Sequence, residues 1–230
     1  MRFKYEHEMV KPAERWLHSQ GLIVRREFCL PWGFCDLAGC SLNGNKVRIR
    51  IARGQTRPIG TPVRVHLLSL IPDVKDDRSI GLGELSEAFR PFLDEGRVES
   101  ELQRLARGKF VRETPDGMYQ KINGWMPLHK RLVAVELKLA RISDVLNQAV
   151  NNLAFADESY VGLPMETARS LVQTKKKAEF AERGIGIIGI APQGCEVLLK
   201  ADPAKANPDE VIQTHCVERF WRTYLKDNSA

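Results

Sequence analysis

Val-Ala-Val-Glu-Leu-Lys-Leu, residues 133–139, is the stretch from which the fold of this chain can be worked out. Its strict alternation predicts a strand over residues 132–139, with the valines and leucines on one face and Glu136 and Lys138 on the other. Two opposite charges in an otherwise apolar strand are costly to bury unless they pair or bind an ion. The pattern therefore leaves two alternatives, a structural Glu–Lys pair and a functional site.

The chain after this strand alternates between helical and strand-like patterns. The sequence predicts a helix at 142–155, a strand at 159–163, a helix at 165–183, a buried strand at 184–191, a strand at 195–200 and a last helix at 208–226. Such alternation is typical of an α/β protein, in which helices flank a sheet.

The chain before it begins with a helix and a hairpin. We expect a helix at 5–20 and strands at 22–30 and 34–42. Residues 46–51 alternate basic and apolar side chains, which predicts a further strand with one basic face.

Residues 66–127 have a different pattern of predicted helices and strands from the segments on either side. Two short helices are expected at 83–92 and 94–107, followed by a hairpin whose strands, 110–112 and 118–122, flank a Thr-Pro-Asp-Gly turn. Helix, turn, helix and hairpin is the order found in a winged helix. We therefore predict a core formed by 1–65 and 128–230 with a winged-helix-like domain inserted at 66–127.

Three motifs on the predicted core form a known combination. Asp36 lies in Gly-Phe-Cys-Asp-Leu on the second strand, Glu136-Leu-Lys138 on the central strand, and Gln148-Ala on the following helix. The set resembles the D…E-x-K…Q-A signature of the PD-(D/E)xK, or restriction-endonuclease-like, nucleases. This resemblance implies a mixed sheet flanked by helices.

The resemblance also implies roles for these residues. Asp36 and Glu136 would bind Mg²⁺ or Mn²⁺, and Lys138 would assist the attacking water. Gln148 would lie beside the site, and a Glu of the first helix would complete the metal site. The candidates are Glu6, Glu8 and Glu14, and Glu8 is preferred over Glu6 because it lies at the edge of the apolar stripe of this helix. Metal-dependent hydrolysis needs oxygen ligands for the cation and an activated water, which these residue types supply.

The spacing departs from the family pattern, in which the Asp and the Glu are close in sequence. Here 100 positions separate Asp36 from Glu136. An inserted domain between the two strands accounts for the gap, since long insertions add little loop entropy.

The distribution of charge points to an anionic partner such as DNA. The net charge is +6, and residues 46–65 carry six Lys and Arg side chains and no acid. The alternative is a solvated edge strand. Residues 66–128 carry nine basic and eleven acidic side chains, so the insert could equally contact protein. The residues expected to contact nucleic acid are Arg48, Arg50, Arg53, Arg57 and Arg141.

Three function classes follow: a Mg²⁺-dependent DNA nuclease, a non-catalytic DNA-binding or regulatory protein, and a protein-interaction adaptor. Many members of the family are dimers, which makes a homodimer a candidate. With no apolar run long enough for a bilayer and no signal-peptide pattern, we expect a cytoplasmic protein without membrane contact. Cys35 and Cys40 have zinc-like spacing, but without a second pair free thiols are favoured.

Overall fold

The computed structural model, which describes residues 3–122, 125–140 and 142–227, contains a mixed sheet of six strands and a separate two-stranded hairpin. The chain divides into unit 1, residues 1–41 and 129–213, and unit 2, residues 42–128 and 214–230. Unit 1 contains α1 (His7–Ser19), β1 (Ile23–Leu30), β2 (Gly33–Leu42), β5 (His129–Leu137), α6 (Ile142–Asn152), β6 (Glu158–Pro164), α7 (Met165–Val172), α8 (Lys176–Glu182), β7 (Gly186–Ala191), β8 (Gly194–Leu199) and a 3-10 turn at Pro203–Lys205.

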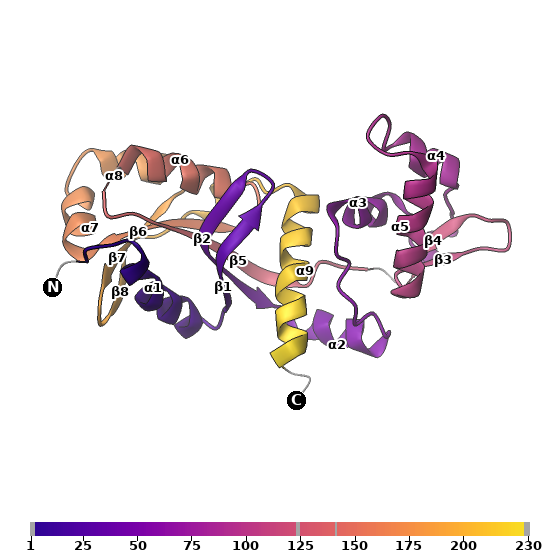
Figure 1. The fold of residues 1–230 in the computed structure, drawn as a ribbon, viewed down its shortest axis with the longest axis horizontal. Coiled ribbons are helices and arrows are strands. Elements are labelled where there is room, and N and C mark those ends of the chain that lie inside the picture. The colour runs from indigo at the N-terminus through magenta and orange to yellow at the C-terminus, as the bar shows by residue number, and fades with distance from the viewer. Residues whose placement is uncertain (1–2, 123–124, 141, 228–230) are drawn as a thin grey trace. The chain divides into compact units, whose positions relative to one another are not determined.

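The strand order is β1-β2-β5-β6-β7-β8 (Figure 1). β1 and β2 form an antiparallel hairpin, β5, β6 and β7 are parallel, and β8 returns antiparallel to β7. The parallel strands need crossover connections, which α6 and the α7–α8 pair supply. The predicted α/β architecture with a mixed sheet and flanking helices is confirmed.

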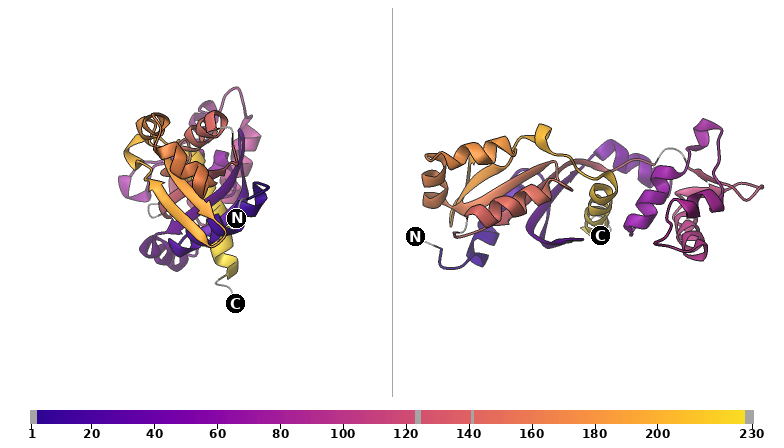
Figure 2. Two further views of the ribbon diagram at one scale, coloured as in Figure 1. Left: turned by 90° about the vertical axis from the view of Figure 1, so that its left-hand side faces the viewer. Right: turned by 90° about the horizontal axis from the view of Figure 1, so that it is seen from above.

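Both faces of the sheet are covered, as the turned views show (Figure 2). One face packs on α1, through Met9, Ala13 and Leu17. The other packs on α6, α7 and α8 through a second apolar cluster. Because Val133, Val135 and Leu137 belong to the α1 cluster, alternation turns Glu136 toward α6. The predicted strand around Glu136 is thus confirmed, with its apolar face as expected.

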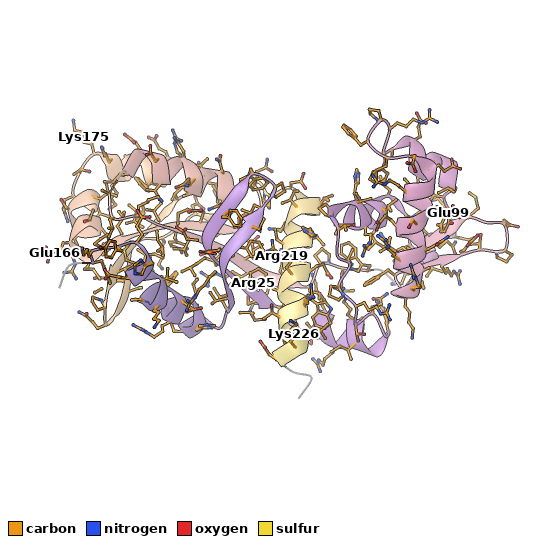
Figure 3. All side chains as sticks on the ribbon, viewed as in Figure 1. Arg25, Glu99, Glu166, Lys175, Arg219 and Lys226 are labelled. Carbon is orange, nitrogen blue, oxygen red and sulfur yellow. The ribbon has the colours of Figure 1, made fainter. Side chains whose placement is uncertain are left out.

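Unit 2 contains mostly helices and one short hairpin. Its elements are α2 (Gly44–Ala52), α3 (Pro62–Leu70), a 3-10 turn at Val74–Asp76, α4 (Leu82–Glu87), α5 (Glu95–Arg107), β3 (Val111–Glu113), β4 (Tyr119–Lys121) and most of α9 (Glu210–Asp227). The predicted helices near 83–92 and 94–107 and the hairpin after them are present as α4, α5 and β3–β4. Figure 3 shows the side chains, with Glu99 on the exposed part of α5.

The prediction of a strand at 46–51 is wrong, because these residues lie in α2. Asn43 caps this helix through its side chain, which accepts hydrogen bonds from the backbone N–H groups of Asn45 and Lys46. Val47 and Arg50 are buried, three positions apart, whereas Ile49 and Ile51 are exposed. The buried face therefore follows a helical period, and the alternation of basic and apolar letters was coincidental.

Three further boundaries differ from the expected ones. Residues 42–65 and 214–230 belong to unit 2, although we placed them with the first and second parts of the core. The helix expected at 165–183 is interrupted, because α7 ends at Val172 and α8 begins at Lys176. Thr174 turns its hydroxyl back to the carbonyl of Leu171 at the break, which competes with the helical backbone pattern. In the part of the chain that is described, no helix is long and apolar enough to cross a membrane.

Candidate functional site

The structure brings Asp36 and Glu136 together from neighbouring strands. β2 and β5 are adjacent in the sheet, and Asp36 Oδ2 accepts a hydrogen bond of 2.7 Å from the backbone N–H of Leu137, the residue after Glu136. Asp36 is half-buried and Glu136 is 2% exposed. Two acidic residues that are 100 positions apart in the sequence thus lie close together on adjacent strands.

Glu136 is an acid held in an unfavourable environment for its charge. Burial and the nearby carboxylate of Asp36 together raise its pKa to about 7, against the lowering effect of a hydrogen bond from Asn152. That bond joins Asn152 Nδ2 to Glu136 Oε1 at 2.7 Å. A buried carboxylate beside another retains a proton near neutral pH unless a cation or hydrogen-bond donors stabilise the anion.

Lys138 pairs with an acid that precedes the first helix. Its Nζ lies 3.3 Å from Oε2 of Glu6, and the other oxygen of Glu6 accepts from the backbone N–H of Leu139 at 3.4 Å. The Lys138 side chain is one-quarter exposed and that of Glu6 somewhat more. The two charges of the E-x-K motif therefore do not form a Glu136–Lys138 pair: each residue has its own partner.

A pocket of about 720 Å³ opens beside these residues within unit 1. Glu6, Asp36 and Leu137 line it together with the start of α1 and the middle of β1. Its basic lining residues are His7, Lys11 and Arg26. Acidic and basic side chains therefore line the same pocket.

Glu8, the acid preferred from the sequence, also lines this pocket but has a local role. Its carboxylate accepts hydrogen bonds from the backbone N–H groups of Lys4 at 2.6 Å and Tyr5 at 3.1 Å. These bonds lower the pKa of Glu8. The acid that contacts Lys138 is Glu6, one of the alternatives considered for this position.

Gln148 is exposed on α6, and Asn152, one turn further on, is the residue that contacts Glu136. Asn152 was not among the residues expected at the site. A signal was present in the sequence: Asn152 follows Ala149 by three positions, which turns it toward the buried side of the helix. A polar residue at such a position needs a partner inside the protein.

Strained backbone lies directly across the hairpin from Asp36. Arg26 pairs with Leu37 and Phe28 with Cys35, so Glu27 lies opposite Asp36. Glu27 has a φ of 44°, in the left-handed region that side chains other than glycine rarely adopt. Such residues cost on the order of 1–3 kcal/mol and cluster at functional sites, where the surrounding structure holds them.

The predicted nucleic-acid contacts are divided by the structure. Arg48 and Arg57 are exposed and Arg53 is half-buried. Arg50 is 3% exposed and forms an ion pair with Glu218. It is therefore not available to a phosphate and is not part of the predicted nucleic-acid-binding surface. Arg141 lies outside the described residues.

The donors at the site fit a hard divalent cation. Mg²⁺ binds oxygen and is commonly held by one or two carboxylates, with water and substrate oxygens completing its shell. Asp36 and Glu136 supply two such carboxylates, and their mutual repulsion would be relieved by a cation. Among the described residues, Cys35 and Cys40 included, no group of three or more His, Cys, Asp or Glu side chains is placed to hold a metal.

Comparisons with protein-family models, with curated proteins and with solved structures gave no match to this chain.

Proposed function

We propose that the chain is a Mg²⁺- or Mn²⁺-dependent nuclease that hydrolyses phosphodiester bonds of DNA, built on a restriction-endonuclease-like core with a winged-helix-like domain between its halves. One observation carries the proposal: Asp36 and Glu136 meet on adjacent strands although 100 positions separate them, as the E-x-K resemblance requires.

The arrangement of elements supports this fold. A helix, an antiparallel hairpin and a parallel strand with the E-x-K motif follow one another in unit 1, and a helix crosses from that strand to the next. In unit 2, α3, α4 and α5 precede the hairpin β3–β4, which is the order of a winged helix. The hairpin is antiparallel, with Arg112 opposite Gln120.

The proposed roles follow from the contacts of each side chain. Asp36 and Glu136 would hold the cation, which when bound supplies Lewis-acid activation of the phosphate and a more acidic water. Asn152 orients Glu136 and favours its charged form. Lys138, held by Glu6, would face the water and the charge that develops on the phosphate in the transition state.

A non-catalytic DNA-binding protein is the second candidate, and the contacts of the site give it some support. Lys138 is already paired with Glu6, and Glu136 accepts a hydrogen bond from Asn152. Both contacts could equally stabilise a scaffold that no longer cleaves. The intact pair of carboxylates favours the nuclease. Two neighbouring carboxylates in the interior destabilise the folded protein, so a scaffold that binds no cation would gain nothing from keeping them.

The test is cleavage of supercoiled plasmid and of single-stranded DNA with Mg²⁺, Mn²⁺ or EDTA. We expect metal-dependent cleavage by the wild type and a loss of at least about 100-fold in Glu136→Gln, which keeps the shape and removes the charge. Glu196→Gln removes an exposed acid of the same unit, paired with Arg169, and is the matched control. No cleavage under any condition, with DNA binding retained, would reject the nuclease in favour of the second candidate.

A further inference from the structure

Unit 2 contains a polar pocket of about 270 Å³ that is bordered by four arginines. Arg57 comes from the loop after α2, Arg64 from α3, and Arg104 and Arg107 from the last turns of α5. Ile59, Leu105 and Phe110 also line it and are buried, so the pocket has an apolar floor beneath its guanidinium groups. Three separate segments therefore converge on one basic cavity.

The acid near these arginines does not neutralise them. Glu101 forms ion pairs with Arg64 and with Arg104, the latter at 2.6 Å between Nη1 and Oε1. Arg57 and Arg107 have no acidic partner among the residues that the structure describes, and Arg107 Nε donates to the carbonyl of Gln103 at 3.4 Å. No acid lines the described part of this cavity. An excess of positive charge thus remains beside a cavity with room for several waters, each of which takes about 30 Å³ in the liquid.

A helix dipole alone does not explain this cluster. Basic residues in the last turn of α5 interact favourably with its C-terminus, which would account for Arg104 and Arg107. Arg57 and Arg64 belong to other segments, and their presence at the same cavity needs a further reason.

The loop that carries Arg57 is fixed from the interior. Arg50 Nη2 donates to the carbonyl of Arg57 at 3.2 Å, and Glu218 accepts from the backbone N–H of Ile59 at 2.9 Å. On the opposite side, Arg64 Nη1 donates to the carbonyl of Ile59 at 2.5 Å. The position of the Arg57 backbone is therefore set before any ligand arrives, which lowers the entropic cost of binding.

We infer that this pocket, defined by Arg57, Arg64, Arg104 and Arg107, binds a phosphodiester group of a nucleic-acid backbone. Guanidinium groups match phosphate oxygens in charge and in hydrogen-bond geometry. Arg57 and Arg107 supply the free donors, and Glu101 holds Arg64 and Arg104 at the border of the cavity. Such a contact positions the backbone and carries no sequence information by itself.

The test is the affinity of the full chain for a fluorescein-labelled DNA duplex, measured by anisotropy in EDTA so that binding is read without cleavage. We expect Arg57→Gln/Arg107→Gln to weaken binding at least about ten-fold at 0.1 M salt and to lower the slope of log K against log salt by roughly two. Arg90→Gln/Arg97→Gln removes the same charge from exposed positions of unit 2 outside the pocket and is the control. Thermal unfolding checks that all variants are folded.

An equal loss in both double variants, or no loss in either, would overturn the inference. The second source of such a ligand is free phosphate, so the arginine Nε–H signals of the wild type are also followed by NMR during addition of inorganic phosphate. Shifts at Arg57 and Arg107 with millimolar phosphate, together with unchanged duplex affinity in the double variant, would assign the pocket to free phosphate and reject the backbone. Because the pocket lies in unit 2, either result leaves the proposed catalytic site untouched.

Discussion

Asn152 Nδ2 lies 2.7 Å from Glu136 Oε1, so the last residue of α6 donates a hydrogen bond to the buried acid of β5. Both side chains are 2% exposed. This contact lowers the pKa of Glu136, whereas burial and the charge of Asp36 raise it, and the outcome is a pKa of about 7. The charge state of the candidate metal ligand therefore depends on a neighbouring amide that the nuclease motif does not include.

Replacing that amide has an expected consequence for Glu136. Asn152→Leu removes the donor with little change in volume, so we expect the pKa of Glu136 to rise above that of the wild type. At alkaline pH, the free energy of unfolding should fall by about 1–3 kcal/mol, because an anion would remain buried without its donor. The acidic limb of the pH–cleavage profile should move to higher pH. Asn151→Leu, at an exposed neighbour, is the control, and identical profiles for both variants would show that the hydrogen bond is unimportant.

The raised pKa of Glu136 also predicts how stability depends on pH without metal. The pKa is about 7 in the folded protein and 4.5 ordinarily, so between these values the folded state binds more protons than the unfolded one. The stabilisation is therefore fully present below pH 4.5 and is lost as the pH rises through 7, by up to about 3 kcal/mol.

Urea unfolding in EDTA across this pH range measures the effect, as the difference between the wild type and Glu136→Gln. We expect Glu136→Gln to be the more stable protein at pH 8 and the difference to shrink toward pH 5. Mg²⁺ added at pH 8 should stabilise the wild type and leave the variant unchanged. A difference that does not vary with pH would mean that Glu136 titrates normally.

The importance for cleavage of Glu6, the acid that contacts Lys138 in the structure, can be compared directly with that of Glu8, the acid preferred from the sequence. Glu6 contacts both the Lys138 ammonium and the backbone of Leu139, whereas Glu8 bonds the backbone just ahead of α1. Glu6→Gln should therefore reduce cleavage by about 10- to 100-fold, as losses of partners around a metal site do. Glu8→Gln should keep wild-type cleavage. The reverse ranking, measured under saturating Mg²⁺, would restore Glu8 as the acid of the site.

The parts of this fold that could be predicted are those in which local pattern and burial agree. The strand around Glu136 alternates in sequence and in the structure, because its valines and Leu137 pack on α1 while Glu136 faces the other way. Asp36 could be placed beside it only through the resemblance, since periodicity within each segment says nothing of which strands become neighbours across 100 residues.

The parts that were missed depend on partners far away in the chain. Arg50 was expected on a basic strand face, but its partner Glu218 lies 168 positions away and nothing within 46–51 indicates it. Asn152 was missed, and Glu6 was ranked below Glu8, for a related reason: helical spacing gives the face of a residue but not which side chain lies opposite. Contacts between elements, and not propensity within them, fixed these residues.

The Arg50–Glu218 pair supplies the last prediction, which concerns the stability of unit 2. Arg50 is 3% exposed and Glu218 is 1% exposed, and the guanidinium also lies 5.0 Å from the ring centroid of Phe110 and 5.3 Å from that of Trp221. Removing one partner leaves a buried charge alone, so Arg50→Met should lower the free energy of unfolding by about 3–5 kcal/mol. Arg50→Met/Glu218→Leu should recover a large part of that loss, because neither charge then remains unpaired.

Urea unfolding followed by tryptophan fluorescence reports this change, since Trp221 adjoins the pair. Arg48→Met, an exposed neighbour on the same helix, should change stability by no more than about 0.5 kcal/mol. If instead Arg50→Met left stability unchanged and weakened DNA binding, Arg50 would be a surface phosphate contact, as its sequence context first indicated. A large loss of stability with recovery in the double variant would show that the most basic segment of the sequence holds its central arginine inside the protein. The exposed arginines of that segment, Arg48 and Arg57, would then remain as candidates for contact with a phosphate.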